Sequence, residues 1–140
     1  MKRSMRVVTA LSLAATVLAG SAAMAATPAA KERVKPVDWQ AYGENLSMAL
    51  RSDNLGLQRS ALQTLILKGD KVKLTNGIID VMNVYLTHEN DGFRQLAIVA
   101  MQKVGDEWAM SYLRGRAHLE QSPAVKKTLL TVLNAHYQKG

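Results

Sequence analysis

The chain has 140 residues, of which 48% are hydrophobic and 21% are charged, and it contains no cysteine. This composition excludes a disulfide-stapled small protein, a collagen-like chain and a wholly disordered chain. The length allows one domain, and the low aromatic share of 5% indicates a core built from aliphatic side chains.

The N-terminus has the three-part pattern of a secretory signal peptide. A basic start is followed by an apolar run over residues 7–20 and by small residues at Ala23 and Ala25. We therefore predict a signal peptide over residues 1–25, with cleavage after Ala25 or, as the next best site, after Ala26. The apolar run is shorter than the roughly 20 residues that cross a bilayer, so we expect no stable membrane insertion of the mature chain. The expected location is periplasmic or secreted.

Removing this segment changes the charge. The formal net charge falls from +7 to +4, because the segment contains three basic residues (Lys2, Arg3 and Arg6) and no acidic one. A nucleic-acid-binding protein usually has a stronger, clustered basic excess with aromatic residues for stacking, so we expect no nucleic-acid partner. Residues 26–37 contain two prolines and mixed charges without an apolar period, and this pattern predicts a disordered linker.

From residue 38 onward, apolar residues recur at helical spacing and no stretch alternates as a strand does. Asp38 is expected to cap the first helix, and Ser122 followed by Pro123 to open the last. The apolar stripes are Trp39, Tyr42, Leu46, Ala49 and Leu50; Leu57, Ala61, Leu62, Leu65 and Ile66; Leu74, Ile78, Val81, Met82 and Tyr85; Phe93, Ala97, Ala100, Met101 and Val104; Trp108, Tyr112 and Leu113; and Val125, Leu129, Val132 and Leu133. The predicted fold class is all-α.

The same pattern occurs three times, in segments that begin at residues 56, 92 and 124. In the first two copies a Gly-Asp pair follows at the same offset, as Gly69-Asp70 and Gly105-Asp106. We expect each glycine to end a helix in the left-handed conformation and each aspartate to cap the next helix.

The second copy, with Phe93-Arg94, Ala97, Met101 and the Gly105-Asp106 ending, resembles the second helix of a HEAT repeat of the phycobilin-lyase-type variety. The first copy departs from that pattern at Gln58 and Lys68, and the third lacks the Gly-Asp ending. The resemblance implies an α-α superhelix, or solenoid, of about three helical hairpins over residues 38–70, 71–105 and 106–138, within a domain of residues 38–140. Second helices would line its concave side. Armadillo- or tetratricopeptide-like stacking is the alternative.

No pattern typical of a catalytic or metal site is found. The three histidines, at positions 88, 118 and 136, are far apart in sequence and lack metal-ligand spacing. His88 is followed by a polar segment that ends in Gly92, but this segment lacks the alternating ligands of a calcium loop; Asn90 or Asp91 is expected to cap a helix there. We therefore expect no enzymatic activity, no cofactor and no metal.

The candidate functional residues are basic. Arg59, Arg94, Lys126 and Lys127 follow the leading apolar residue of each copy, and Lys103 extends the set on the middle copy. Stacked repeats would place them in a row that accepts an acidic or extended segment of a partner protein. Two alternatives stay open: an internal hydrogen-bonding ladder, favoured slightly for Arg94, and a solvated face.

The predicted function is that of a non-catalytic protein–protein interaction or adaptor module, with a homo-oligomer possible. One alternative is a structural subunit of a larger envelope complex or homo-oligomer that makes contact through its ends. A less favoured alternative is an accessory ligand-binding or lyase-like protein.

Overall fold

The computed structural model describes residues 34–138, and all the regular structure among them is helical. The helices are α1 (Trp39–Leu50), α2 (Leu55–Lys68), α3 (Gly77–Thr87), α4 (Asp91–Val104), α5 (Glu107–Arg116) and α6 (Pro123–Tyr137), with a 3₁₀ helix, η1 (Ala117–Leu119), after α5. The all-α prediction is confirmed for these residues. The predicted signal peptide, residues 1–25, and residues 26–33 of the predicted linker lie outside the described residues.

Most helices begin with a polar side chain that accepts hydrogen bonds from the first backbone N–H groups. Asp38 accepts from the N–H groups of Gln40 and Ala41, both at 3.0 Å. The caps of the later helices are Asn54 for α2, Asn90 for α4, Asp106 for α5 and Ser122 for α6, where Pro123 takes the first helical position. The predicted roles of Asp38, Asn90, Asp106 and Ser122 are therefore confirmed.

The two Gly-Asp pairs differ in structure. Gly105 has a φ of 73°, and its N–H binds the carbonyl of Met101, as a left-handed helix end requires. The same prediction is wrong for Gly69, whose φ is −58°. A Cβ on Gly69 would lie 2.9 Å from the backbone of Lys103 and of Val104, so glycine is needed there because the end of α2 touches the end of α4.

The prediction that Asp70 caps the next helix is also wrong. Asp70 is exposed in a turn, and α3 begins only at Gly77, after Asn76. Leu74, predicted to start the apolar stripe of this helix, lies in the preceding segment and is half-buried there.

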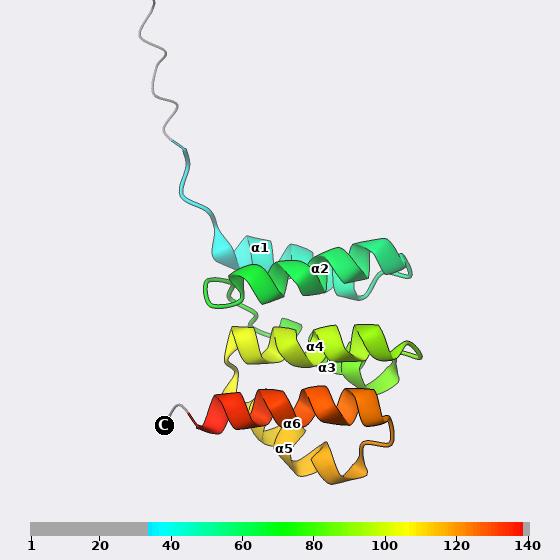
Figure 1. Ribbon diagram of the computed structural model, residues 1–140. Helices are drawn as coiled ribbons and strands as arrows, with labels where there is room; N and C mark the ends of the chain where they lie inside the picture. Colours follow the sequence, from blue (N-terminus) through cyan, green and yellow to red (C-terminus); the bar gives the residue numbers. More distant parts are fainter. Residues whose placement is uncertain (1–33, 139–140) are drawn as a thin grey trace, which may run out of the picture. The chain divides into compact units, whose positions relative to one another are not determined.

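The helices lie in two layers, which Figure 1 shows within the part of the chain it draws in colour. Helices α2, α4 and α6 lie side by side, since α4 contacts both of the others, and α1, α3 and α5 pack behind them. All belong to one compact unit, Lys35–Gly140. The core lies between the layers, and its largest fully buried side chains are Tyr85, Leu62, Leu65, Ile98, Met101, Met110, Leu113, Leu129, Val81 and Val125.

Two residues of the predicted apolar stripes are exposed. Trp108 is 57% exposed and Leu57 is 48% exposed. Helix α5 instead buries Ala109, Met110 and Leu113, and Trp108 stacks on Tyr112 along the side of the helix, with 5.8 Å between ring centroids. No helix among residues 34–138 combines the length and the apolar character that crossing a membrane requires.

Candidate functional site

Gln58 and Arg94, which hold corresponding positions in α2 and α4, both bind the end of the preceding helix. The Nε2 of Gln58 donates to the carbonyls of Leu50 and Ser52, at 3.1 and 2.8 Å. The Nε of Arg94 donates to the carbonyl of Tyr85 at 2.9 Å. The last carbonyls of a helix have no partner within it, so these two side chains supply the missing donors.

Arg94 also takes part in a buried ion pair. Its Nη2 lies 2.6 Å from an oxygen of Glu120, whose side chain is only 3% exposed. The same carboxylate accepts from the Tyr85 hydroxyl at 3.1 Å and from the Ser122 N–H at 3.0 Å. Arg94 further contacts Asp91 at 3.4 Å. The network therefore joins α3 and α4 to the turn before α6.

The network shifts the pKa values of Glu120 and Tyr85. Burial alone would raise the pKa of Glu120, but the hydrogen bonds from Ser122 and Arg94 outweigh it and hold the pKa below its usual value. Burial raises the pKa of Tyr85, and the Glu120 carboxylate raises it further. Glu120 is thus ionised and Tyr85 protonated at neutral pH.

The other four predicted site residues lie at the surface. Arg59, Lys103 and Lys127 are exposed and Lys126 is half-buried, and none of them forms an ion pair with an acidic residue in the described part of the chain. The guanidinium of Arg59 lies over the Phe93 ring, 4.9 Å from its centroid, so it connects α2 to α4. We call these four residues, on α2, α4 and α6, the basic surface.

Charge is divided unequally between the two layers. The basic residues of α2, α4 and α6 are Arg59, Lys68, Arg94, Lys103, Lys126 and Lys127, whereas their one acidic residue is Asp91. The charged residues of α1, α3 and α5 are Glu44, Asp80, Glu107, Arg114 and Arg116. One layer is therefore strongly positive and the other slightly negative.

Glutamines connect α4 to α6 beside the basic surface. Gln95 Nε2 donates to the Ala124 carbonyl at 3.1 Å and to the Thr128 hydroxyl at 3.0 Å, and Gln102 Nε2 lies 3.4 Å from the Val132 carbonyl. Gln95 therefore has a structural role, as Arg94 does.

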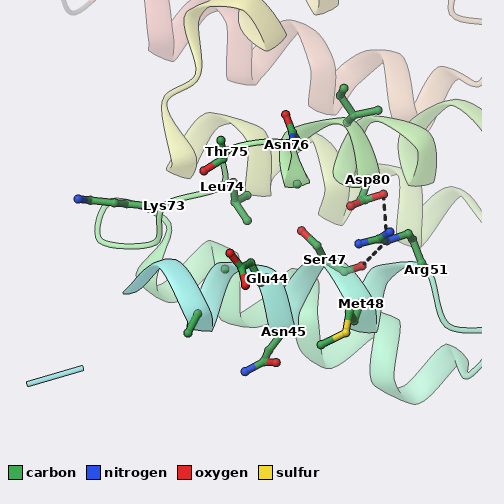
Figure 2. Close-up of a pocket in the computed structure, with 14 residues that line it drawn as sticks. Glu44, Asn45, Ser47, Met48, Arg51, Lys73, Leu74, Thr75, Asn76 and Asp80 are labelled. Carbon is green, nitrogen blue, oxygen red and sulfur yellow. Dashed lines mark hydrogen bonds and ion pairs between the residues drawn. The ribbon is translucent and has the colours of Figure 1, made fainter. Parts of the chain in front are cut away.

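A cavity of about 670 Å³ lies on the other layer, and the sequence analysis did not predict it. Figure 2 shows its lining residues on α1, on α3 and on the segment that leads into α3. Its polar side chains include Glu44, Ser47, Arg51, Lys73 and Asp80. The pairing of Arg51 with Asp80, at 3.5 Å, closes one end. These residues form no sequence motif, because α1 and α3 are brought together only by tertiary packing.

Within residues 34–138 no three side chains of histidine, aspartate or glutamate gather closely enough to hold a metal ion. Two of the three histidines, His88 and His136, make separate local contacts. His88 stacks on Phe93 with ring centroids 4.2 Å apart, and its Nδ1 accepts from the Asn90 N–H. His136 lies 3.2 Å from Glu107.

Comparison of the chain with protein-family models, curated proteins and solved structures finds no match to it.

Proposed function

We propose that this protein is an exported, non-catalytic interaction module that binds an acidic or extended segment of a partner protein through the basic surface. The observation that carries the proposal is the charge division between the layers. Arg59, Lys103, Lys126 and Lys127 have no acidic partner within the described residues, so they remain available to carboxylates of another molecule. Arg94 is not part of the proposed contact, because Glu120 already binds it.

The architecture we propose is a short HEAT-like array of three helix pairs, α1–α2, α3–α4 and α5–α6, with the basic surface on its concave side. The side-by-side packing of α2, α4 and α6 supports this arrangement. So does the corresponding role of Gln58 and Arg94, each of which binds the end of the first helix in its pair. In such arrays every pair contacts only its neighbours, and aligned residues form a continuous binding face.

The test is a cross-linked pull-down from the bacterial envelope with tagged protein. A triple variant, Arg59→Glu, Lys126→Glu and Lys127→Glu, reverses three of the four charges of the basic surface and leaves Lys103 and Arg94 in place. We expect a specific protein that the wild type captures to be lost from this variant, because carboxylates would then face carboxylates.

A second triple variant controls for total charge. Lys35→Glu, Lys71→Glu and Arg114→Glu change the net charge equally but lie outside the basic surface. Circular dichroism must show that both variants fold. Equal capture by wild type and both variants would contradict the proposed contact, as would equal loss in both variants.

A structural subunit that makes contact through its ends is the second candidate, and exposed apolar residues favour it. Leu67 on α2, in the first pair, is 79% exposed, and Trp108 on α5, in the last pair, is 57% exposed. Isolated apolar residues at a surface are common. This candidate function therefore requires that substitution of both residues disrupts binding of the partner or self-association. A Leu67→Glu and Trp108→Glu variant that loses the partner, or dissociates a homo-oligomer in ultracentrifugation, would support it.

A further inference from the structure

The last helix of the layer formed by α2, α4 and α6 exposes a leucine at a position that the other two helices bury. Leu130 lies eight residues after the cap of α6, as Leu62 and Ile98 do after the caps of α2 and α4. Leu62 and Ile98 are fully buried, whereas Leu130 is 45% exposed. Helix α2 is followed in the layer by α4, and α4 by α6, but within residues 34–138 no helix follows α6 (Figure 1).

The first helix of the layer shows the complementary gap. Leu57 lies three residues after the cap of α2, at the position that Phe93 holds in α4 and Val125 in α6. Phe93 and Val125 are buried in helices that have a preceding neighbour in the layer, whereas α2 has none among the described residues and Leu57 is 48% exposed. The terminal repeats of such arrays normally have a polar outer face. Each end here exposes a leucine at a position that a further helix pair would cover.

The contact between α4 and α6 shows which polar groups one helix of the layer offers to the next. Gln95 donates to the Ala124 carbonyl and to the Thr128 hydroxyl. Arg94 pairs with Glu120 at 2.6 Å. The earlier helix thus supplies donors four and five residues after its cap. The later helix supplies an acid just before its cap and acceptors in its first two turns.

The two ends of the chain carry the matching halves of this contact. Lys126 and Lys127 hold the two donor positions in α6, and neither has an acidic partner within residues 34–138. At the other end, Ser60 provides a hydroxyl at the position of the acceptor in α6, and the exposed Asp53 lies directly before the cap of α2. The end formed by α6 is therefore positive, and the start of α2 offers a carboxylate that no described residue pairs with.

We propose that the protein associates head to tail with further copies of itself, so that the α1–α2 pair of one copy continues the layer beyond α6 of another. Leu130 of one copy and Leu57 of the next bury each other, and Lys126 faces Asp53. A two-fold contact of α6 with α6 would instead gather the lysines of both copies in one interface. The contact requires the repeat architecture proposed above but not the binding of a partner through the basic surface. A head-to-tail contact repeats itself, so it generates rings or filaments.

The first test is sedimentation velocity of the protein purified from the envelope, at increasing concentration. We expect the weight-average molar mass to rise beyond that of a dimer. Leu57→Glu and Leu130→Glu should each weaken association at least tenfold, because each places a carboxylate in the apolar contact. Both positions are exposed, so circular dichroism should show unchanged folding. Leu67→Glu, at a more exposed leucine of α2 outside the contact, should associate as the wild type does. A wild type that stays monomeric, or stops at a dimer, would overturn the proposal.

Disulfide formation tests the geometry, since the chain has no cysteine of its own. A Leu57→Cys variant is mixed with a ¹⁵N-labelled Leu130→Cys variant and oxidised, and mass spectrometry separates mixed from like dimers. We expect the mixed dimer to exceed both like dimers at least tenfold. A Leu67→Cys variant in place of Leu57→Cys is the control and should give no such excess. A predominant like dimer through position 130 would show the two-fold contact and refute the head-to-tail one.

Charge exchange separates this contact from the proposed function. Asp53→Lys and Lys126→Glu should each weaken self-association several-fold, and a chain with both changes should recover it, because the pair is then inverted. A double variant no better than either single one would contradict the contact. Asp53→Lys and Leu57→Glu leave the basic surface unchanged, so both should still capture the partner in the pull-down. Loss of self-association with retained capture, or the reverse, shows which of the two contacts is wrong.

Discussion

Glu120 is the residue at which the buried polar contacts meet. Three donors, from Tyr85, Arg94 and Ser122, surround its carboxylate, which is almost fully excluded from water. A buried carboxylate is tolerated only when it is paired and hydrogen-bonded. The sequence analysis did not single out Glu120, because its partners Tyr85 and Arg94 lie 35 and 26 residues earlier in the chain.

Glu120→Gln is expected to lower the free energy of unfolding by about 2 kcal/mol at pH 7, since hydrogen bonds to a charged group are replaced by neutral ones. The pKa of Glu120 is lower in the folded chain than in the unfolded chain. Its contribution is therefore complete above the unfolded value of about 4.3 and is lost as the pH falls through the folded value. Urea unfolding from pH 7 to pH 3 should show the wild type and the variant converging at acid pH. Glu89→Gln, at an exposed glutamate, is the control, and a constant difference at every pH would argue against the network.

Gln58 is the second side chain with a structural role. Gln58→Ala leaves the carbonyls of Leu50 and Ser52 without their donor, so it should cost about 1–2 kcal/mol in thermal or urea unfolding. Gln63→Ala, an exposed position of the same helix, should change stability by no more than about 0.5 kcal/mol. Equal effects of the two substitutions would mean that the hydrogen bonds from Gln58 to the end of α1 do not stabilise the fold.

At the scale of the helices, the ends were predicted well where a local side chain determines them. Asp38, Asn90, Asp106 and Ser122 each act within three residues of themselves, so their spacing in the sequence is sufficient. The prediction for Gly69 was wrong because tertiary packing, and not a left-handed helix end, requires glycine at this position. Its neighbour in space is the backbone of Lys103 and Val104, and no sequence pattern reports that contact.

Two glycines give a direct test of helix ends. Gly105→Ala should destabilise the protein by about 1–2 kcal/mol, because its φ of 73° is unfavourable for a residue with a Cβ. Gly115→Ala should stabilise it by about 0.5–1 kcal/mol, because alanine is a better helix former and a Cβ there would meet nothing within 4 Å. Thermal unfolding of both variants measures the two effects. A change of the melting temperature in the same direction for both variants would contradict the roles given to Gly105 and Gly115.

At the scale of the whole molecule, the structure divides the predicted site residues into two groups. Arg59, Lys103 and Lys127 are exposed as the proposed row requires, but Arg94 is engaged within the chain. The spacing of residues along a repeat indicates which helix face they share, yet it does not distinguish a free cation from one bound to a distant acid. The cavity between α1 and α3 was missed for a related reason, since its lining comes from two separate elements.

The predicted signal peptide can be tested through the mass of the mature protein. The protein recovered from the envelope of a Gram-negative host is expected to begin at Ala26, because small residues at Ala23 and Ala25 fit a signal peptidase. Intact mass spectrometry measures this, and Ala25→Arg is expected to block or displace the cleavage. Recovery of the full chain, with residues 1–25 retained in the wild type, would contradict the assignment.

The central claim is that the layer of α2, α4 and α6 contacts the partner. Site-specific photo-crosslinking tests it most directly, with the crosslinker placed at Gln63 and Thr131, one turn from Arg59 and Lys127, or at Asn83 and Ser111 on α3 and α5. All four positions are exposed. The account predicts one common covalent adduct from Gln63 and Thr131 and none from Asn83 or Ser111. An adduct that forms only from Asn83 and Ser111 would place the partner on the opposite layer and contradict it.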